Sequence, residues 1–281
     1  MEGLGDEILH GMALIFLYML VLLLAKMAKD KLTPYRVDEE LHEKDNVALA
    51  TSIAGYLAAT TIIFIGCLLG PSQGITADLM TVGGYSMLGI ALLNFSRVIN
   101  DRFILHSFSN VKEIIEDRNV GTGAVLFGSY VASGLIVAGA IHGEGGGILS
   151  LLVFFSLGQI SLILFSKIYN WMTPFDIHEE IEHDNIAAGV AFGGTLVAVG
   201  IILMKGASGN FVGWAYNLGI FGMDMLLVFL LLPMVRFFFD KVILPKTSLD
   251  HEIQYDRNLG AGLIEMIGAI SFSVILLFTM T

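Results

Sequence analysis

The sequence is poor in cysteine and in charge. Cys67 is the only cysteine among the 281 residues, so neither an internal disulfide nor a multi-thiolate metal site can form. Charged residues make up 15% of the chain, against about 25% in a typical soluble domain. The 15 lysines and arginines are outnumbered by 26 aspartates and glutamates, which disfavours a nucleic-acid partner. The composition therefore argues against both a soluble enzyme domain and a nucleic-acid binder.

Catalytic signatures are also missing from the sequence. There is no nucleophile elbow, His-Glu-x-x-His pair, Walker motif or Rossmann fingerprint. His178 and His183 lie near acidic residues, but they are five positions apart and do not share a helical face. We therefore predict that the protein is not an enzyme and that it binds neither a metal nor a cofactor.

Long apolar segments are what the chain has in abundance. Hydrophobic residues make up 55% of it, and the mean hydropathy is +0.77. A helix needs about 20 apolar residues to cross a bilayer core. Eight stretches qualify, at about 11–28, 47–69, 79–99, 120–141, 148–168, 186–204, 211–235 and 259–280. The sequence predicts an all-α integral membrane protein with eight transmembrane helices in a lipid bilayer.

The connections between these spans alternate in character. Those after the first, third, fifth and seventh spans are long and charged, and the others are short and rich in glycine. Of the 15 basic residues, 14 lie on the long-linker side, and Lys205 lies on the other. By the positive-inside rule the long linkers are cytoplasmic and both termini face out. Asp6 and Glu7 precede the first span where a signal peptide carries basic residues, so we expect that helix to be retained.

An internal repeat organises the chain. Each even-numbered span begins just after an asparagine, with a small residue four positions later and a glutamate six positions earlier. Asn46 and Asn185 are 139 residues apart, as are Asn119 and Asn258. The pattern predicts two tandem, parallel four-helix units, residues 1–142 and 143–281, each made of two related helical hairpins. The repeated glutamates and asparagines are Glu40, Asn46, Glu113, Asn119, Glu179, Asn185, Glu252 and Asn258.

These residues resemble a known family. Paired helices, a charged linker and a Glu-x5-Asn start to a glycine-bearing helix are similar to the DUF350 family, also called UPF0719 or YjfL-like bacterial inner-membrane proteins. The resemblance covers essentially the whole chain and implies a fusion of two half-length members. It implies a multi-pass protein of the bacterial inner (cytoplasmic) membrane without an established biochemical activity. Associations of the family with ATP-grasp ligases and envelope-stress proteins imply a cytosolic partner.

Polar groups inside the predicted spans are the first candidates for a functional site, because each is costly in lipid. They are Asp224, Glu265, Asn94 and Gln159. The positions equivalent to the two acids in the first unit hold Tyr85 and Leu126, so charge breaks the internal symmetry. One interpretation is an ion or proton path. In the other, each acid is protonated, paired internally or turned to water.

The repeated linker residues allow two interpretations. Asparagine at a helix start favours capping of the backbone N–H groups, and the glutamates suit ion pairs with neighbouring linkers. Alternatively, both sets line a cytoplasmic mouth, where carboxylates attract cations. We expect an amphipathic helix in each linker, with Ile114, Ile181 and Ile253 on its apolar face.

Two functions follow from these features. The first is a channel or carrier for a small cation or cationic solute, which the intramembrane acids favour. The alternative is a membrane scaffold or accessory subunit that docks a cytosolic partner through its charged linkers. The sequence leaves a homo-oligomer open in either case.

Overall fold

The computed structural model describes the backbone of residues 2–279 and the side chains from Gly5 onward, and in that part the chain is helical without strands. Eight helices are long and apolar enough to cross a membrane, as predicted. The expected end of the last span, Met280, lies outside the described residues. The long helices are α1 (Glu2–Leu32), α3 (Val47–Leu68), α4 (Ile75–Ile99), α6 (Val120–Ile141), α7 (Gly147–Met172), α9 (Ile186–Ala207), α10 (Trp214–Phe238) and α12 (Leu259–Thr279).

Two spans continue into a turn of irregular helix. A π-helical turn, η1 (Asn100–Ile104), continues α4, and η2 (Phe239–Ile243) continues α10. The two turns begin 139 residues apart, so the repeat extends to this irregular geometry. An aspartate in each turn then bonds the start of the next short helix. Asp101 accepts from the Asn110 side chain at 2.6 Å, and Asp240 accepts from the Leu249 N–H at 2.6 Å.

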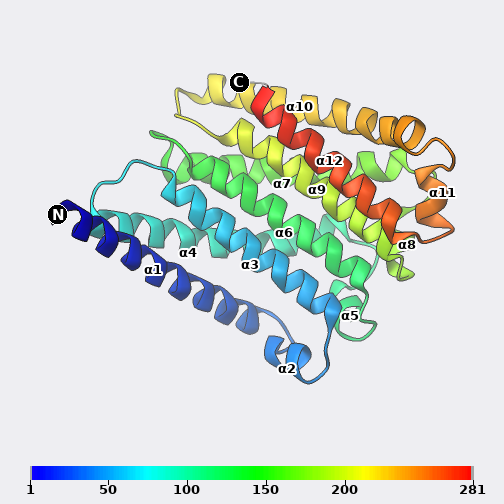
Figure 1. The fold of residues 1–281 in the computed structure, drawn as a ribbon, viewed down its shortest axis with the longest axis horizontal. Coiled ribbons are helices and arrows are strands. Elements are labelled where there is room, and N and C mark those ends of the chain that lie inside the picture. The colour runs from blue at the N-terminus through cyan, green and yellow to red at the C-terminus, as the bar shows by residue number, and fades with distance from the viewer. Residues whose placement is uncertain (1, 280–281) are drawn as a thin grey trace.

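Four short helices occupy the long linkers and lie at one end of the molecule, which we call the linker end (Figure 1). The opposite end carries the three short loops, and we call it the short-loop end. As predicted, the linker helices bury apolar residues, among them Ile114, Ile181 and Ile253. They are α2 (Val37–His42), α5 (Asn110–Ile115), α8 (Ile177–Glu182) and α11 (Leu249–Gln254).

Helices α3, α6, α9 and α12 lie side by side, and we call them the row helices (Figure 1). Glycines bring their backbones into direct contact, which is how small residues act between membrane helices. A Cβ on Gly128 would lie 2.0 Å from the Gly193 oxygen, and one on Gly55 would lie 2.4 Å from the Phe127 Cα. No larger side chain fits at these crossings.

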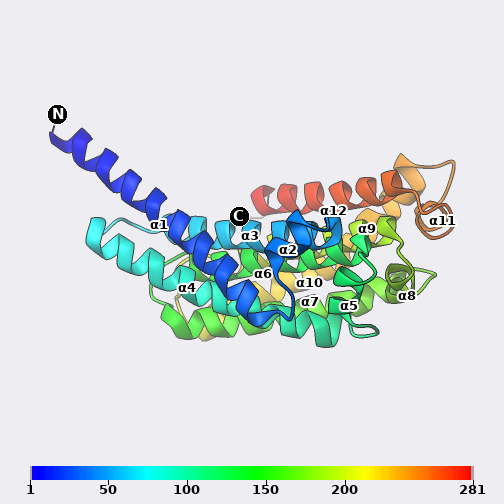
Figure 2. The ribbon, with the colours of Figure 1, turned by 90° about the horizontal axis from the view of Figure 1, so that it is seen from below.

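The remaining long helices flank the row. Helix α4 contacts α3 and α6, α7 contacts α6 and α9, and α10 contacts α9 and α12. Within the row, helix α1 packs mainly on α3 and reaches α6 through the side chains of Lys29 and Tyr130. Its N-terminal part projects from the rest (Figure 2). Each flanking helix other than α1 therefore lies between two row helices.

The predicted halves, 1–142 and 143–281, meet where α6 packs on α9. This junction is built like the others, because a Cβ on Gly189 would lie 2.3 Å from the Gly121 oxygen. One buried core runs from α1 through α12 across the junction. Four repeats thus follow one another in a single row.

Candidate functional sites in the membrane and at the linker end

The four repeat asparagines cap the row helices, which confirms the capping interpretation. The Oδ1 atom of Asn119 accepts the N–H of Thr122 at 3.0 Å, and the first and third repeats match this geometry. Asn258 accepts the N–H of Gly260 at 2.9 Å. The capping oxygens satisfy backbone donors that have no partner inside the helix.

The residue before each asparagine adopts a left-handed backbone. The φ angles are 48° at Asp45, 54° at Arg118, 60° at Asp184 and 48° at Arg257. This conformation is rare outside glycine, asparagine and aspartate. All four repeats therefore make the same sharp turn from the linker into the row.

The asparagine amides also join consecutive repeats, which sequence reasoning missed. The Nδ2 of Asn46 donates to the Ile114 carbonyl at 2.9 Å. Asn119 donates to Ile181 at 2.6 Å, and Asn185 donates to Ile253 at 2.8 Å. In each case the acceptor lies in the linker of the following repeat. Asparagine is the side chain for this position, because one amide both caps a helix and donates outward.

Each asparagine is also held by a glutamate of its own linker. The Asn amide donates to Glu40 at 3.2 Å, to Glu113 at 2.8 Å and to Glu252 at 2.8 Å. In the third repeat the acceptor is Glu180 at 2.8 Å, and the predicted Glu179 is exposed. The correction has a simple cause, since the turn after α8 is one residue shorter than its counterparts.

Two of the repeat glutamates, Glu40 and Glu113, are bonded within their own linkers. Glu40 and Glu113 are 3% and 4% exposed, and each bonds its own asparagine. The ion pair that Glu40 makes is with Lys44 of the same linker, at 2.5 Å. Glu40 therefore forms an ion pair, as expected of these glutamates, but within its own linker. The burial of Glu40 and Glu113 does not fit a ring of carboxylates at a pore mouth.

The two buried glutamates differ in their electrostatics. Burial opposes the charge of Glu40, but hydrogen bonds from Lys44 and Asn46 outweigh it and hold the pKa below its usual value. Burial raises the pKa of Glu113, and the bond from Asn119 offsets this only in part. The reason lies four residues on, where the first repeat has Lys44 and the second has Asp117.

Asp224 is paired inside the bundle. Its two carboxylate oxygens each lie 3.2 Å from the Nζ of Lys205, and the residue is 2% exposed. Lys205 is the one basic residue toward the short-loop end. The pair compensates both charges across the α9–α10 contact.

Glu265 is the centre of a longer chain of polar groups. Its Oε1 accepts from the Tyr169 hydroxyl at 2.6 Å and from the Arg236 Nε at 2.9 Å. The Arg236 Nη2 also donates to Asp250 of α11 at 2.6 Å. The second oxygen, Oε2, has no hydrogen-bond partner within the described part of the chain. A void of about 10 Å³ is lined by Glu265, Tyr169 and Arg236, among others, and has room for about one water molecule.

A buried cation, Lys29, was missed because it lies near the end of a span. It is 1% exposed, and its Nζ donates to the Tyr130 hydroxyl. The Nζ lies 4.6 Å from the centroid of the Tyr130 ring and 5.1 Å from that of Tyr56. No carboxylate lies within 4 Å of it in residues 5–279. Aromatic faces and a hydroxyl take the place of a counter-ion.

The two predicted polar amides lie apart from the acids. Asn94 donates to the Tyr56 hydroxyl at 3.0 Å. Gln159 donates to the Ser133 hydroxyl at 3.0 Å. Both bonds join a flanking helix to a row helix. The structure therefore does not bring the four predicted intramembrane residues into one site.

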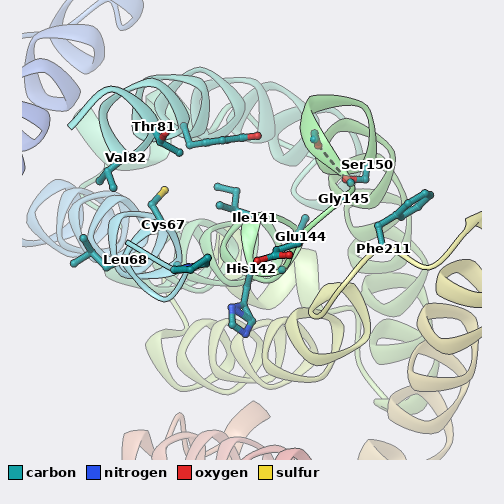
Figure 3. Close-up of a pocket in the computed structure, with 18 of the residues that line it drawn as sticks. Cys67, Leu68, Thr81, Val82, Ile141, His142, Glu144, Gly145, Ser150 and Phe211 are labelled. Atoms are coloured by element: carbon teal, nitrogen blue, oxygen red, sulfur yellow. Dashed lines mark hydrogen bonds between the residues drawn. The ribbon is translucent and has the colours of Figure 1, made fainter. Parts of the chain in front are cut away.

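A cavity of about 400 Å³ opens at the short-loop end. Its lining includes Cys67, Val82, Ile141 and Glu144 (Figure 3). It reaches Asn217 of α10 but neither Asp224 nor Glu265. The larger cavity and the void at Glu265 share no lining residue.

Comparison with known proteins now places the chain. A family model described as Domain of Unknown Function (DUF350) matches residues 3–141 and again residues 145–280. The chain belongs to the DUF350 family. It carries two tandem DUF350 segments, as the repeat predicted, and the segment boundary falls in the short loop between α6 and α7.

Two relatives named as UPF0719 transmembrane proteins are similar to this chain. A UPF0719 transmembrane protein of Aquifex aeolicus (strain VF5) is 24% identical over 237 residues, 82% of this chain and 84% of the relative. The UPF0719 transmembrane protein YshE of Bacillus subtilis (strain 168) is 24% identical over 127 residues, 43% of this chain and 86% of YshE. YshE thus matches less than half of this chain along most of its own length. No solved structure matches the chain significantly.

The two DUF350 segments place different charges at equivalent sites. Arg97 and Arg236 correspond, and both stand near the end of a flanking helix. Leu126 of the first segment corresponds to Glu265 of the second, and Lys29 corresponds to Tyr169. The first segment therefore buries a cation where the second buries a carboxylate and its arginine.

Proposed function

We propose that this DUF350 protein is a non-catalytic membrane scaffold of the bacterial inner membrane, with its linker end in the cytoplasm. The observation that carries the proposal is that both intramembrane acids are paired with a basic side chain and lie outside the large cavity. Asp224 is paired with Lys205 and Glu265 with Arg236, and the large cavity stops at Asn217. Ion conduction needs a continuous hydrated path, whereas docking needs only an ordered surface.

The linker end supplies that surface. The four linkers are fixed to one another by the bonds from Asn46, Asn119 and Asn185, so their outer residues are held in register. Many of those outer residues are acidic and exposed: Glu39, Glu43, Asp45, Glu116, Asp117, Glu179, Glu182, Asp184 and Asp256. Exposed lysines and arginines lie among these acids, including Arg36, Lys44, Lys112, Arg118 and Arg257. A surface with both signs of charge in fixed positions suits a soluble partner whose charges are complementary to it.

Charge reversal tests the scaffold. Purification from native membranes compares the wild type with a variant carrying Glu43→Lys, Glu116→Lys and Glu182→Lys. The matched control is Glu144→Lys, an exposed acid at the short-loop end. We expect a defined partner to be retained by wild type and control, lost by the triple variant and released by salt. Identical partners in all three samples would contradict the proposal.

Orientation is tested separately with a membrane-impermeant maleimide on intact cells. In a Cys67→Ser background, a cysteine at Ser72 in a short loop should react from outside, and one at Glu43 should not. The reverse pattern would place the linker end outside the cell and would exclude a cytosolic partner for the linkers.

A second candidate, transport of a proton or small cation, is favoured by one observation. Glu265 lines a void with room for one water molecule, its Oε2 has no hydrogen-bond partner within the described residues, and Arg236 connects the same carboxylate to Asp250 at the linker end. Such chains serve as proton relays in membrane proteins. Proteoliposome flux measurements decide this case. Transport requires a flux that is lost on combining Asp224→Asn with Glu265→Gln, and the scaffold requires no flux in any variant.

A further inference from the structure

The row of helices is built on one rule of contact. We count positions from the capping asparagine, so that Gly123 is position 4 of α6. At every junction, position 4 of one helix lies on position 2 of the helix before it. A Cβ on Gly123, Gly189 or Gly262 would lie 2.5, 2.3 or 2.5 Å from the carbonyl oxygen of the facing residue. Those facing residues are Ala48, Gly121 and Ala187.

A second rule holds further along the same helices. Position 9 of one row helix lies on position 8 of the next. The pairs are Gly55 with Phe127, Gly128 with Gly193, and Gly194 with Met266. One member of each pair is always glycine, so a small residue faces whatever its partner presents.

The first and last row helices, α3 and α12, each have contact positions that face no partner helix within the described residues. On α12, positions 2 and 9 are Gly260 and Ile267, and Ile267 is 53% exposed. On α3, positions 4 and 8 are Ala50 and Ala54, and both are exposed. The uncovered face of α12 therefore carries a large residue, Ile267, at the position that would contact the small Ala54 on the uncovered face of α3.

The hydrogen bond between repeats is unmatched in the same way. Asn46, Asn119 and Asn185 each donate to the linker that follows. Within the described residues Asn258 has no following linker, and its amide bonds only Glu252. In the first linker, Leu41 follows Glu40 as Ile114 follows Glu113, so it occupies the acceptor position.

Helix α1 completes the pattern. Helices α4, α7 and α10 each pack on the row helix of their own repeat and on that of the preceding repeat. Within the described residues no row helix precedes α3, so α1 lacks the second of these contacts. It is the least buried of the eight spans. The open side of α1 is the place that a preceding row helix would take.

We propose that copies of this chain assemble head to tail in the membrane, with α12 of one copy against α3 and α1 of the next. Asn258 of one copy then donates to the linker of the next, with Ile267 against Ala54. The contact is heterologous, so it closes into a ring or continues as an open row. Lipid can cover an apolar face, but it cannot supply the ordered backbone acceptor that three of the four asparagines use. The assembly holds for a scaffold and for a transporter alike.

Cysteine cross-linking tests the contact in membranes. Two single-cysteine proteins are made in the Cys67→Ser background, one with Ala54→Cys and one with Ile267→Cys. We expect disulfide-linked dimers when the two are co-expressed and none when either is expressed alone. Ala91→Cys, on an exposed alanine of α4, replaces Ala54→Cys in the control and should give none. Cross-linking of either single protein with itself, or none in the mixture, would overturn the proposal.

A bulky substitution tests the same face without cysteine. Ala54→Trp should reduce the native mass of the detergent-purified protein from a multimer to one 30.5 kDa chain plus detergent. Ala91→Trp, matched in residue type and exposure, should leave the multimer intact. Both variants should keep the wild-type helical content in circular dichroism, because neither alanine is buried in the chain. A wild-type protein that already has the mass of one chain would overturn the proposal.

Discussion

The side-chain amide of Asn119 donates to the backbone carbonyl of Ile181 at 2.6 Å, across 62 residues of sequence. The bond joins the start of one row helix to the linker of the next, on the other side of the boundary between the DUF350 segments. The same amide group caps its own helix through Oδ1. Asn119 is therefore a joint between the halves of the protein as well as a helix cap.

Removing that joint should cost more than removing a cap. We expect Asn119→Ala to lose about 1 kcal/mol for the cap and about 1–3 kcal/mol for the buried acceptor left behind. Asn258→Ala, which breaks no bond between repeats of one chain, should lose only the cap. Unfolding of the monomeric proteins in detergent measures both, and equal losses would show that the Ile181 bond contributes nothing.

The linker glutamates should respond to pH in opposite directions. The raised pKa of Glu113 contributes stability that is present below its unfolded value and is lost as pH rises through the folded value. The lowered pKa of Glu40 contributes stability that is present above its unfolded value and is lost as pH falls. Relative to wild type, the melting temperature of Glu113→Gln should therefore rise with pH, and that of Glu40→Gln should fall.

Asp117→Lys provides a direct check on the cause. It places a lysine four residues after Glu113, as Lys44 follows Glu40. The protein should then no longer lose stability through Glu113 as pH rises. Arg118→Lys changes no charge and serves as the control. An unaltered pH dependence in Asp117→Lys would show that the missing cation is not what separates the two linkers.

Arginine at a left-handed position should be replaceable with a gain. Arg118 has φ 54°, a conformation that costs about 1 kcal/mol for most residues but that asparagine adopts readily. Arg118→Asn should therefore raise the free energy of unfolding by up to that amount. Arg118→Gln is the control, because it removes the same charge at the same position but glutamine does not favour the left-handed region. Equal effects of the two changes would mean that charge, not backbone conformation, is responsible.

The glycine crossings should tolerate no side chain. A Cβ on Gly128 would lie 2.0 Å from the Gly193 oxygen, so Gly128→Ala forces α6 and α9 apart. We expect a loss of at least about 1–3 kcal/mol, the usual range for an overpacked core. Gly222→Ala on α10 meets nothing within 4 Å and should be neutral or stabilising. Thermal unfolding of the two variants separates crowding from general glycine effects.

The pair of Glu265 and Arg236 should be easier to remove whole than by halves. Glu265→Leu leaves a buried arginine with only Asp250, and Arg236→Met leaves a buried carboxylate. Each single change should cost about 3–5 kcal/mol, and the double variant should recover most of it. Leu126, at the equivalent place in the first segment, indicates that leucine packs there. Additive losses in the double variant would contradict a coupled pair.

The sequence predicted the eight spans and the repeat because apolar length and recurring residues are local signals. The bounds of α6, Val120–Ile141, agree with the expected 120–141. Capping by the asparagines was also predictable, since it depends on the few residues that follow. The second role of Asn119 was not, because its acceptor at Ile181 is fixed only when the repeats pack in order.

Pairing inside the membrane was beyond the sequence for a similar reason. Asp224 and Lys205 lie 19 residues apart on different helices, and only the α9–α10 contact brings them together. Lys29 was overlooked because its sequence position suits a side chain reaching to the membrane surface. The sequence predicted Glu179 where the structure has Glu180 because a fixed spacing of six residues before the asparagine was assumed. The turn after α8 is one residue shorter, so the glutamate that bonds Asn185 lies five residues before it.

The inequality of the two DUF350 segments has a consequence for stoichiometry. When a single-segment chain packs with its own copies, every copy places the same side chain at the same site. A buried charge is then repeated in each copy and never faces an opposite charge at the equivalent site. Fusion of two segments into one polypeptide lifts that constraint. This chain carries Lys29 once and Glu265 once, at alternate places along the row. Two fused segments can therefore bury opposite charges at different sites, which identical single-segment subunits cannot do.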